Sequence, residues 1–197
     1  MRTAPVIPVL VVDDAAQARP MAEALVAGGL TVLEVTLRTP AALDVIREMK
    51  QVPGAIVGAG TVLNKVQLDA ALDAGAEFVV SPGLTDTCAR AAIASGVPYL
   101  PGVATTSDIM RGLDLGLDRF KFFPAMASGG TPTLKALAAV FGEVRFCPTG
   151  GITEETASEW LALEAVLCVG GSWVVPKGPL DPRAVEEAAR RASRLPR

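Results

Sequence analysis

A lysine flanked by aromatic residues is the first candidate for chemistry. Lys121 lies in the segment RFKFFP at positions 119–124, whose aromatic residues favour a strand. Side chains alternate across a strand, so Lys121 shares one face with Arg119 and Phe123. Inside a barrel the amine would lose the hydration that favours its charged form, and a free amine attacks carbonyl groups. The alternative is a lysine that only balances a buried carboxylate or extends to the rim.

A carboxylate occupies a comparable place in an earlier segment. Positions 32–38 read VLEVTLR, so Glu34, Thr36 and Arg38 share one face and the opposite face is apolar. The apolar face must pack on helices, which predicts that the polar face points into a barrel. Glu34 is therefore a candidate general acid–base, and the alternative is an internal ion pair between Glu34 and Arg38.

Glycine pairs follow the last two predicted strands. Barrel enzymes commonly bind phosphate in the loops after strands 7 and 8, where backbone N–H groups are the donors. Glycine lets the backbone approach an anion closely, although one glycine pair by itself also makes a tight turn. The two motifs are Thr149-Gly150-Gly151 and Gly170-Gly171-Ser172. Two such pairs at these positions favour a phosphate site.

Small residues end several other strands as well. The segments GAGT (58–61), SPG (81–83) and PG (101–102) indicate a narrow mouth with backbone close to a small ligand. Thr61 is a candidate polar contact, with a helix N-cap as the alternative. Pro82 joins it as a candidate binding residue.

The elements needed to position these residues alternate along the chain. Predicted strands cover 6–12, 31–37, 55–59, 78–81, 99–101, 120–123, 144–147 and 165–169. Predicted helices cover 15–27, 41–50, 65–74, 85–94, 107–115, 133–140, 154–163 and 183–194, with Asn64, Thr85, Ser107 and Thr153 as caps. Eight strand–helix units predict a single-domain (β/α)8 TIM barrel over residues 1–197, with short loops and little or no helix before strand 1. The alternative, an open doubly wound sheet, usually carries a glycine-rich turn after its first strand, and none follows here.

Composition excludes several function classes. The chain has no histidine, which removes Ser-His and Cys-His nucleophiles and the usual ligands of catalytic zinc. A net charge of −3 and 5% aromatic residues argue against binding to nucleic acid or to a membrane surface. The N-terminus lacks a signal-peptide pattern, and the three cysteines are expected to be buried thiols. These features predict a cytoplasmic protein.

The same segments resemble the 2-keto-3-deoxy-6-phosphogluconate (KDPG) aldolase family, which are class I pyruvate aldolases. The resemblance covers nearly the whole chain and rests on LEVTLRT (33–39), VGAGTVL (57–63), SPG (81–83), FKFFPA (120–125), RFCPTGGI (145–152) and VGGSW (169–173). It implies that Lys121 forms a Schiff base with the substrate ketone and that Glu34 is the general acid–base. It also implies a homotrimer that needs no metal or other cofactor.

The resemblance assigns binding roles too. Arg38 and Thr61 would hold the pyruvoyl end of a phosphorylated 2-keto sugar acid, and Phe123 would form a wall beside the Schiff base. The phosphate would bind at Gly150, Gly151, Gly171 and Ser172. Two other functions stay open from the residues alone: a phosphosugar isomerase with Glu34 as base, and a phosphate-ligand binder without catalysis. The phosphogalactonate epimer and 4-hydroxy-2-oxoglutarate are further possible substrates.

Overall fold

Strands and helices alternate along the chain, as the sequence predicts. The computed structural model describes residues 3–176 and 178–196. In chain order the elements are β1 (Val6–Leu10), the 3-10 helix η1 (Ala15–Gln17), α1 (Ala18–Ala27), β2 (Val32–Thr36), α2 (Ala42–Met49), β3 (Ile56–Gly60), α3 (Lys65–Asp73), β4 (Val79–Val80), α4 (Asp86–Ser95), β5 (Tyr99–Leu100), β6 (Gly102–Val103), α5 (Thr106–Asp114), β7 (Arg119–Phe122), α6 (Gly130–Val140), β8 (Arg145–Pro148), α7 (Ala157–Leu161), β9 (Val169–Gly171) and α8 (Pro182–Ser193). Residues 3–5, which precede β1, are not helical, as expected.

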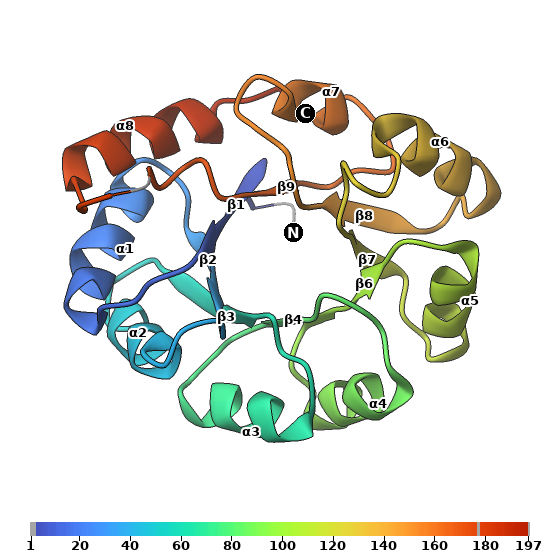
Figure 1. Cartoon of the computed structure of the whole chain (residues 1–197), viewed down its shortest axis with the longest axis horizontal. Coiled ribbons are helices and arrows are strands. Elements are labelled where there is room, and N and C mark those ends of the chain that lie inside the picture. The colour runs from blue at the N-terminus through green and yellow to red at the C-terminus, as the bar shows by residue number, and fades with distance from the viewer. Residues whose placement is uncertain (1–2, 177, 197) are drawn as a thin grey trace.

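The strands form a curled, parallel arrangement with helices on its outer side (Figure 1). One sheet has the order β5-β4-β3-β2-β1-β9, and a second has the order β6-β7-β8. Every strand pair in both sheets is parallel. Parallel strands place all their carboxyl ends on one side of the molecule, so the predicted site residues there can converge.

Two regions separate the sheets. The predicted strand at 99–101 ends one residue earlier, as β5, and a further strand, β6, begins after Pro101, since proline has no N–H to donate to a neighbour. In the part of the chain that the structure describes, two isolated bridges join the region of β8 to that of β9, Phe146 with Val166 and Thr149 with Gly170. The register slips by one residue between these bridges, which indicates a bulge. This is why the last strand begins at Val169, whereas the sequence predicted 165–169.

Because side chains alternate between the two faces of each strand, the apolar residues form two clusters. The larger lies between strands and helices and includes Phe120 and Phe122 of β7, both fully buried. The smaller contains Ile7, Val32, Val80, Leu100, Cys147, Leu167 and Cys168, with Phe78 against it, and includes no helical residue. Val32 and Glu34 are two residues apart on β2, so Glu34 belongs to this inner face.

Helix ends confirm some predicted caps and correct others. The side chains of Asn64 and Thr85 accept hydrogen bonds from backbone N–H groups of α3 and α4, as expected. At α5 the cap is Thr105, not Ser107, because Thr105 and Asp108 form a reciprocal capping box. Thr153 caps no helix, since α7 begins only at Ala157.

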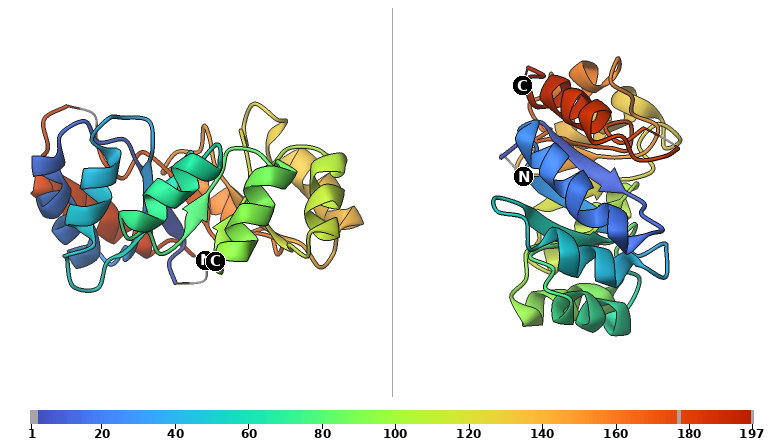
Figure 2. Two further views of the ribbon diagram at one scale, coloured as in Figure 1. Left: turned by 90° about the horizontal axis from the view of Figure 1, so that it is seen from below. Right: turned by 90° about the vertical axis from the view of Figure 1, so that its left-hand side faces the viewer.

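Helix α8 packs beside α1, so the end of the chain lies against its beginning (Figure 2). A Cβ atom at Gly28 would lie 2.4 Å from the Cβ of Ala189, so glycine is required for this approach. The Ser193 hydroxyl also donates a 2.9 Å hydrogen bond to the carbonyl of Gly28. None of the helices in the described chain has the length and apolar content that a bilayer crossing requires.

Candidate functional site

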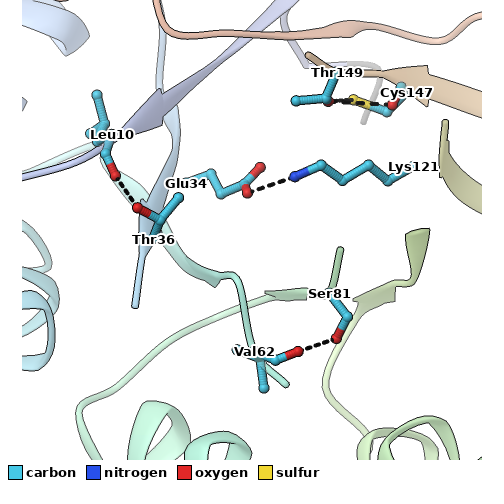
Figure 3. A network of polar contacts seen from close by, with 8 residues as sticks. All are labelled: Leu10, Glu34, Thr36, Val62, Ser81, Lys121, Cys147 and Thr149. Atoms are coloured by element: carbon cyan, nitrogen blue, oxygen red, sulfur yellow. Dashed lines mark hydrogen bonds and ion pairs between the residues drawn. The ribbon is translucent and has the colours of Figure 1, made fainter. Parts of the chain in front are cut away.

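Lys121 and Glu34 meet inside the curled sheet, from β7 and β2 (Figure 3). Lys121 Nζ donates a hydrogen bond of 3.1 Å to Glu34 Oε1. The two residues are only 5% and 3% exposed. The expected inward direction of both side chains is therefore confirmed, and Lys121 does not extend to the rim. Among the described residues, no ion pair joins Glu34 to Arg38, so that alternative is wrong.

Gly60 makes room for the carboxylate of Glu34. A Cβ atom at Gly60 would lie 2.3 Å from Glu34 Oε1 and 2.7 Å from its Cγ. Gly60 pairs in register with Thr36 on β2, which fixes this close approach. Any larger residue at position 60 would displace Glu34 from Lys121.

The amine lies in a mixed aromatic and thiol environment. Lys121 Nζ lies 5.2 Å from the centre of the Phe123 ring. Cys147 is the register partner of Lys121 on β8 and is buried. A hydrogen bond with Cys168 lowers the pKa of Cys147 against the opposing effect of burial, with Lys121 lowering and Glu34 raising it further. Arg119, the first residue of β7, is exposed and forms an ion pair with Asp118, so it is not part of the buried site around Lys121.

Arg38 and Ser172 line one cavity of about 510 Å³ at the carboxyl ends of β1, β2 and β9. The end of β1 contributes to its lining, as do Asp13 and Val175. Arg38 is exposed, so its guanidinium is free to meet an anionic ligand. Lys121 and Glu34 do not line this cavity, which lies to the side of the ion pair.

The backbone conformation favours glycine at both positions of the first pair. Gly150 and Gly151 have φ angles of +105° and +77°, which other residues rarely adopt. Backbone hydrogen bonds from Ala125 to Thr149 and from Met126 to Gly150 join this loop to the one after β7. The loop therefore lies directly beside the end of the strand that carries Lys121.

Close packing requires glycine at both positions of the second pair. Cβ atoms at Gly170 and Gly171 would lie 2.2 Å from Thr149 Oγ1 and 2.0 Å from the Trp173 ring. The bridge between Thr149 and Gly170 places the two glycine motifs side by side. The structure thus brings the predicted phosphate-site residues together.

Thr61 lies at the end of β3 and has a φ of +59°. It does not cap α3, because Asn64 does, so the alternative role predicted for Thr61 is excluded. Pro82 follows β4 closely, and its carbonyl oxygen would lie 2.1 Å from a Cβ atom at Gly102. Tyr99 lies in β5 and its pKa is raised well above its usual value by burial, which does not suit it to proton transfer near neutral pH.

Comparison with known proteins identifies the family. The family model "KDPG and KHG aldolase" matches residues 1–190. The chain is 61% identical to the 2-keto-3-deoxy-6-phosphogluconate aldolase of Zymomonas mobilis, solved with 3-phosphoglycerate, with a TM-score of 0.98 over 100% of this chain and 94% of that one. The chain belongs to the KDPG and KHG aldolase family.

Two other members extend the comparison. The KHG/KDPG aldolase of Escherichia coli K12 is 55% identical over 92% of this chain and 85% of its own length. The KDPG aldolase of Legionella pneumophila is 45% identical, with a TM-score of 0.94 over 98% of this chain and 95% of that one. Its structure holds pyruvate captured at low pH as a covalent carbinolamine intermediate. The resemblance inferred from the sequence motifs is confirmed.

In this KDPG and KHG aldolase family member, the sequence assigned no role to three inner polar residues. Ser81, Thr36 and Cys147 are all buried near the ion pair (Figure 3). The Thr36 hydroxyl donates to the Leu10 carbonyl at 2.8 Å, tying β2 to the end of β1. For Thr36 the sequence did hold a signal, because the alternation of side chains along β2 places it on the same face as Glu34. No group of three potential metal-ligating His, Cys, Asp or Glu side chains occurs in residues 3–176 and 178–196.

Proposed function

We propose that this chain is a class I aldolase that cleaves 2-dehydro-3-deoxy-6-phosphogluconate to pyruvate and D-glyceraldehyde 3-phosphate. One observation carries the proposal: a buried lysine–glutamate pair, 3.1 Å apart, inside the curled sheet of an aldolase-family chain. A lysine held in a buried site is suited to attack a ketone, and its carboxylate partner is suited to move protons.

The reaction would proceed through covalent attachment to Lys121. Its free amine attacks the C2 ketone to give a carbinolamine, and loss of water gives a protonated Schiff base. Glu34, through a water molecule, removes the C4-hydroxyl proton, and the C3–C4 bonding electrons move into the iminium. Glyceraldehyde 3-phosphate leaves, and the remaining enamine takes a proton at C3 from Glu34. Water then hydrolyses the Schiff base and releases pyruvate. The carbinolamine seen in the Legionella relative supports the first step.

Two groups of residues would bind the two ends of the substrate. Arg38 would pair with the carboxylate, and Thr61, Pro82 and Phe123 would surround the pyruvoyl carbons. The phosphate would bind backbone N–H groups and the hydroxyl of the adjoining motifs, at Thr149, Gly150, Gly151, Gly170, Gly171 and Ser172. The 3-phosphoglycerate in the Zymomonas relative supports a site for a phosphorylated three-carbon acid.

We further propose that both sheets close as one (β/α)8 barrel in a single domain spanning 1–197, of which 1, 2, 177 and 197 lie outside the described residues. The bridges Phe146–Val166 and Thr149–Gly170 support closure on one side. On the other side, the Lys121 N–H donates to the carbonyl of Pro101, which lies at the junction between β5 and β6. A cytoplasmic homotrimer remains part of this proposal. So does activity on 4-hydroxy-2-oxoglutarate and the phosphogalactonate epimer, and the shared name of the E. coli relative supports the former.

Replacement of the lysine tests the proposal. Lys121→Ala should lower kcat to background, because no other group forms the Schiff base, while circular dichroism shows a folded protein. Lys135→Ala is the matched control, since Lys135 is an exposed residue of the outer helix α6. Aldol cleavage by Lys121→Ala at a rate near that of Lys135→Ala would overturn the proposed mechanism.

A further inference from the structure

Thr61 has an unusual backbone conformation for its residue type. Its φ of +59° is left-handed, and among the described residues it is the one non-glycine residue with a positive φ. A β-branched side chain makes this conformation costly, and it persists only where neighbouring interactions enforce it. Such residues cluster at ligand-binding sites, and Thr61 lies where β3 ends at the carboxyl side of the sheet.

Hydrogen bonds on both sides of Thr61 enforce this conformation. Before it, the Gly60 carbonyl accepts a 2.8 Å hydrogen bond from the Leu37 N–H. After it, the Val62 N–H donates to the Val80 carbonyl at 3.1 Å. The Val62 carbonyl in turn accepts a short 2.6 Å hydrogen bond from the Ser81 hydroxyl (Figure 3).

The bond from Ser81 is the one that depends on a side chain. Ser81 is 3% exposed and Val62 fully buried, so water has little access to replace the hydroxyl. A buried carbonyl without a donor is costly, which gives the backbone at 61–62 a reason to move if the hydroxyl is removed. The Ser81 hydroxyl also contacts Cys88 Sγ at 3.8 Å, which is long and weak, and interacts with the side chain of Tyr99.

We propose that Ser81 is a positioning residue, which holds Thr61 in its left-handed conformation and thereby sets the affinity for the pyruvoyl end of the substrate. The proposal rests on the proposed function, because it requires that Thr61 contacts this end. The two residues have different roles. Thr61 touches the ligand, whereas Ser81 acts only through its hydrogen bond to the carbonyl of Val62, the residue after Thr61.

Removal of the hydroxyl tests the proposal by a split in kinetic constants. Ser81→Ala should raise the KM for pyruvate in methyl-proton exchange about tenfold with little change in kcat, because ground-state binding is what is lost. The KM for glyceraldehyde 3-phosphate in the synthetic direction should stay within about twofold. Ser95→Ala is the matched control, since its hydroxyl also donates to a backbone carbonyl, of Ala92 at 2.7 Å, but on α4. A Ser81→Ala enzyme with a control-like KM for pyruvate would overturn the proposal.

A double-mutant cycle with Thr61→Ala distinguishes positioning from general support. If Ser81 acts through Thr61, the double variant should have the same KM for pyruvate as Thr61→Ala alone. Independent, multiplicative effects would contradict the proposal. A crystal structure of Ser81→Ala gives a readout without activity: we expect Thr61 to leave its positive φ, and an unchanged φ would refute positioning.

Failure of the proposed function would be visible separately. Borohydride reduction of the wild-type protein with pyruvate tests the Schiff base and does not depend on Ser81. If borohydride traps pyruvate on the wild-type protein and Ser81→Ala has an unchanged KM for pyruvate, only the positioning role is rejected. If borohydride traps no pyruvate on the wild-type protein, the proposed function is rejected, and with it the effect of Ser81 on the affinity for pyruvate.

Discussion

The Lys121–Glu34 pair is hard to explain by stability alone. Burying two charges costs several kcal/mol per ion after relaxation, and apolar residues of similar volume often stabilise a core as well or better. The pair lies above an apolar layer that includes Val32 and Leu100, where packing without charge was available. A chemical role for the two side chains gives a reason for their burial.

Glu34→Gln separates covalent attachment from proton transfer. The amide keeps the shape of the side chain but cannot accept a proton, so pyruvate should still be trapped on Lys121. Exchange of pyruvate methyl protons, followed by NMR in heavy water, should fall about 10²- to 10⁴-fold. Glu23→Gln, on the exposed side of α1, is the control. Exchange by Glu34→Gln at the wild-type rate would show that another group moves the proton.

Much of this site could be predicted at the residue scale. Alternation alone placed Lys121 and Glu34 on inner faces, because the opposite faces of their strands are apolar. It did not predict the exposure of Arg119, since alternation gives the face of a side chain but not the depth of its position along the strand. Ser81 was also beyond reach, because its partner Val62 is 19 residues earlier and is brought near only by the pairing of neighbouring strands.

At the scale of elements, close approaches between strands decide where glycine is needed. Gly60 and Gly170 lack positive φ angles, yet side chains of neighbouring strands fill the space a Cβ would occupy. The sequence predicted the glycine-rich strand ends but assigned them to turns and anion binding. The contacts with Glu34 and Thr149 come from register between strands, which a linear pattern does not contain.

Gly60→Ala tests this packing directly. The added methyl group would contact the carboxylate of Glu34, so we expect kcat to fall about 10²-fold, the usual effect of a displacement near 1 Å at a reacting group. Gly142→Ala is the control, because a Cβ atom there meets nothing within 4 Å. Steady-state kinetics of both variants provide the comparison. An active Gly60→Ala enzyme would mean that the position of Glu34 is not critical.

Helix and strand limits show where local sequence signals fail. Thr105, Thr106 and Ser107 are all plausible caps, and only the reciprocal bond with Asp108 selects the first. Asp108 has a lowered pKa despite its partial burial, because hydrogen bonds from Ala104 and Thr105 outweigh desolvation. The shifted start of β9 has a non-local cause, the bulge against β8, which no local pattern indicates.

At the scale of the whole molecule, the contact between α1 and α8 joins the two ends of the chain. Ala189 is fully buried, and its Cβ would lie 2.4 Å from a Cβ atom at Gly28, so the two helices approach closely at this contact. The sequence predicted the alternation of parallel strands and outer helices, because the type and order of elements depend mainly on local patterns. How the helices fit together depends on the sizes of residues distant in sequence.

Ala189→Leu should therefore destabilise the protein without altering its chemistry. Overpacking at this contact is expected to cost about 1–3 kcal/mol in the free energy of unfolding by urea. The unfolding curve should stay a single transition, and kcat should not change, because the helices lie outside the inner strands. Glu187→Leu, on the exposed side of α8, should shift stability by less than about 0.5 kcal/mol. Two separate transitions would contradict a single domain.

The central claim is that Lys121 forms a covalent Schiff base with the 2-keto group of its substrate. The most direct measurement is peptide mass spectrometry after incubation with pyruvate and borohydride, which reduces only the imine. We predict a single reduced pyruvyl adduct on the peptide that contains Lys121 and none on that of Lys135. A folded protein that carries no adduct at Lys121, or carries it on another lysine, would contradict the account.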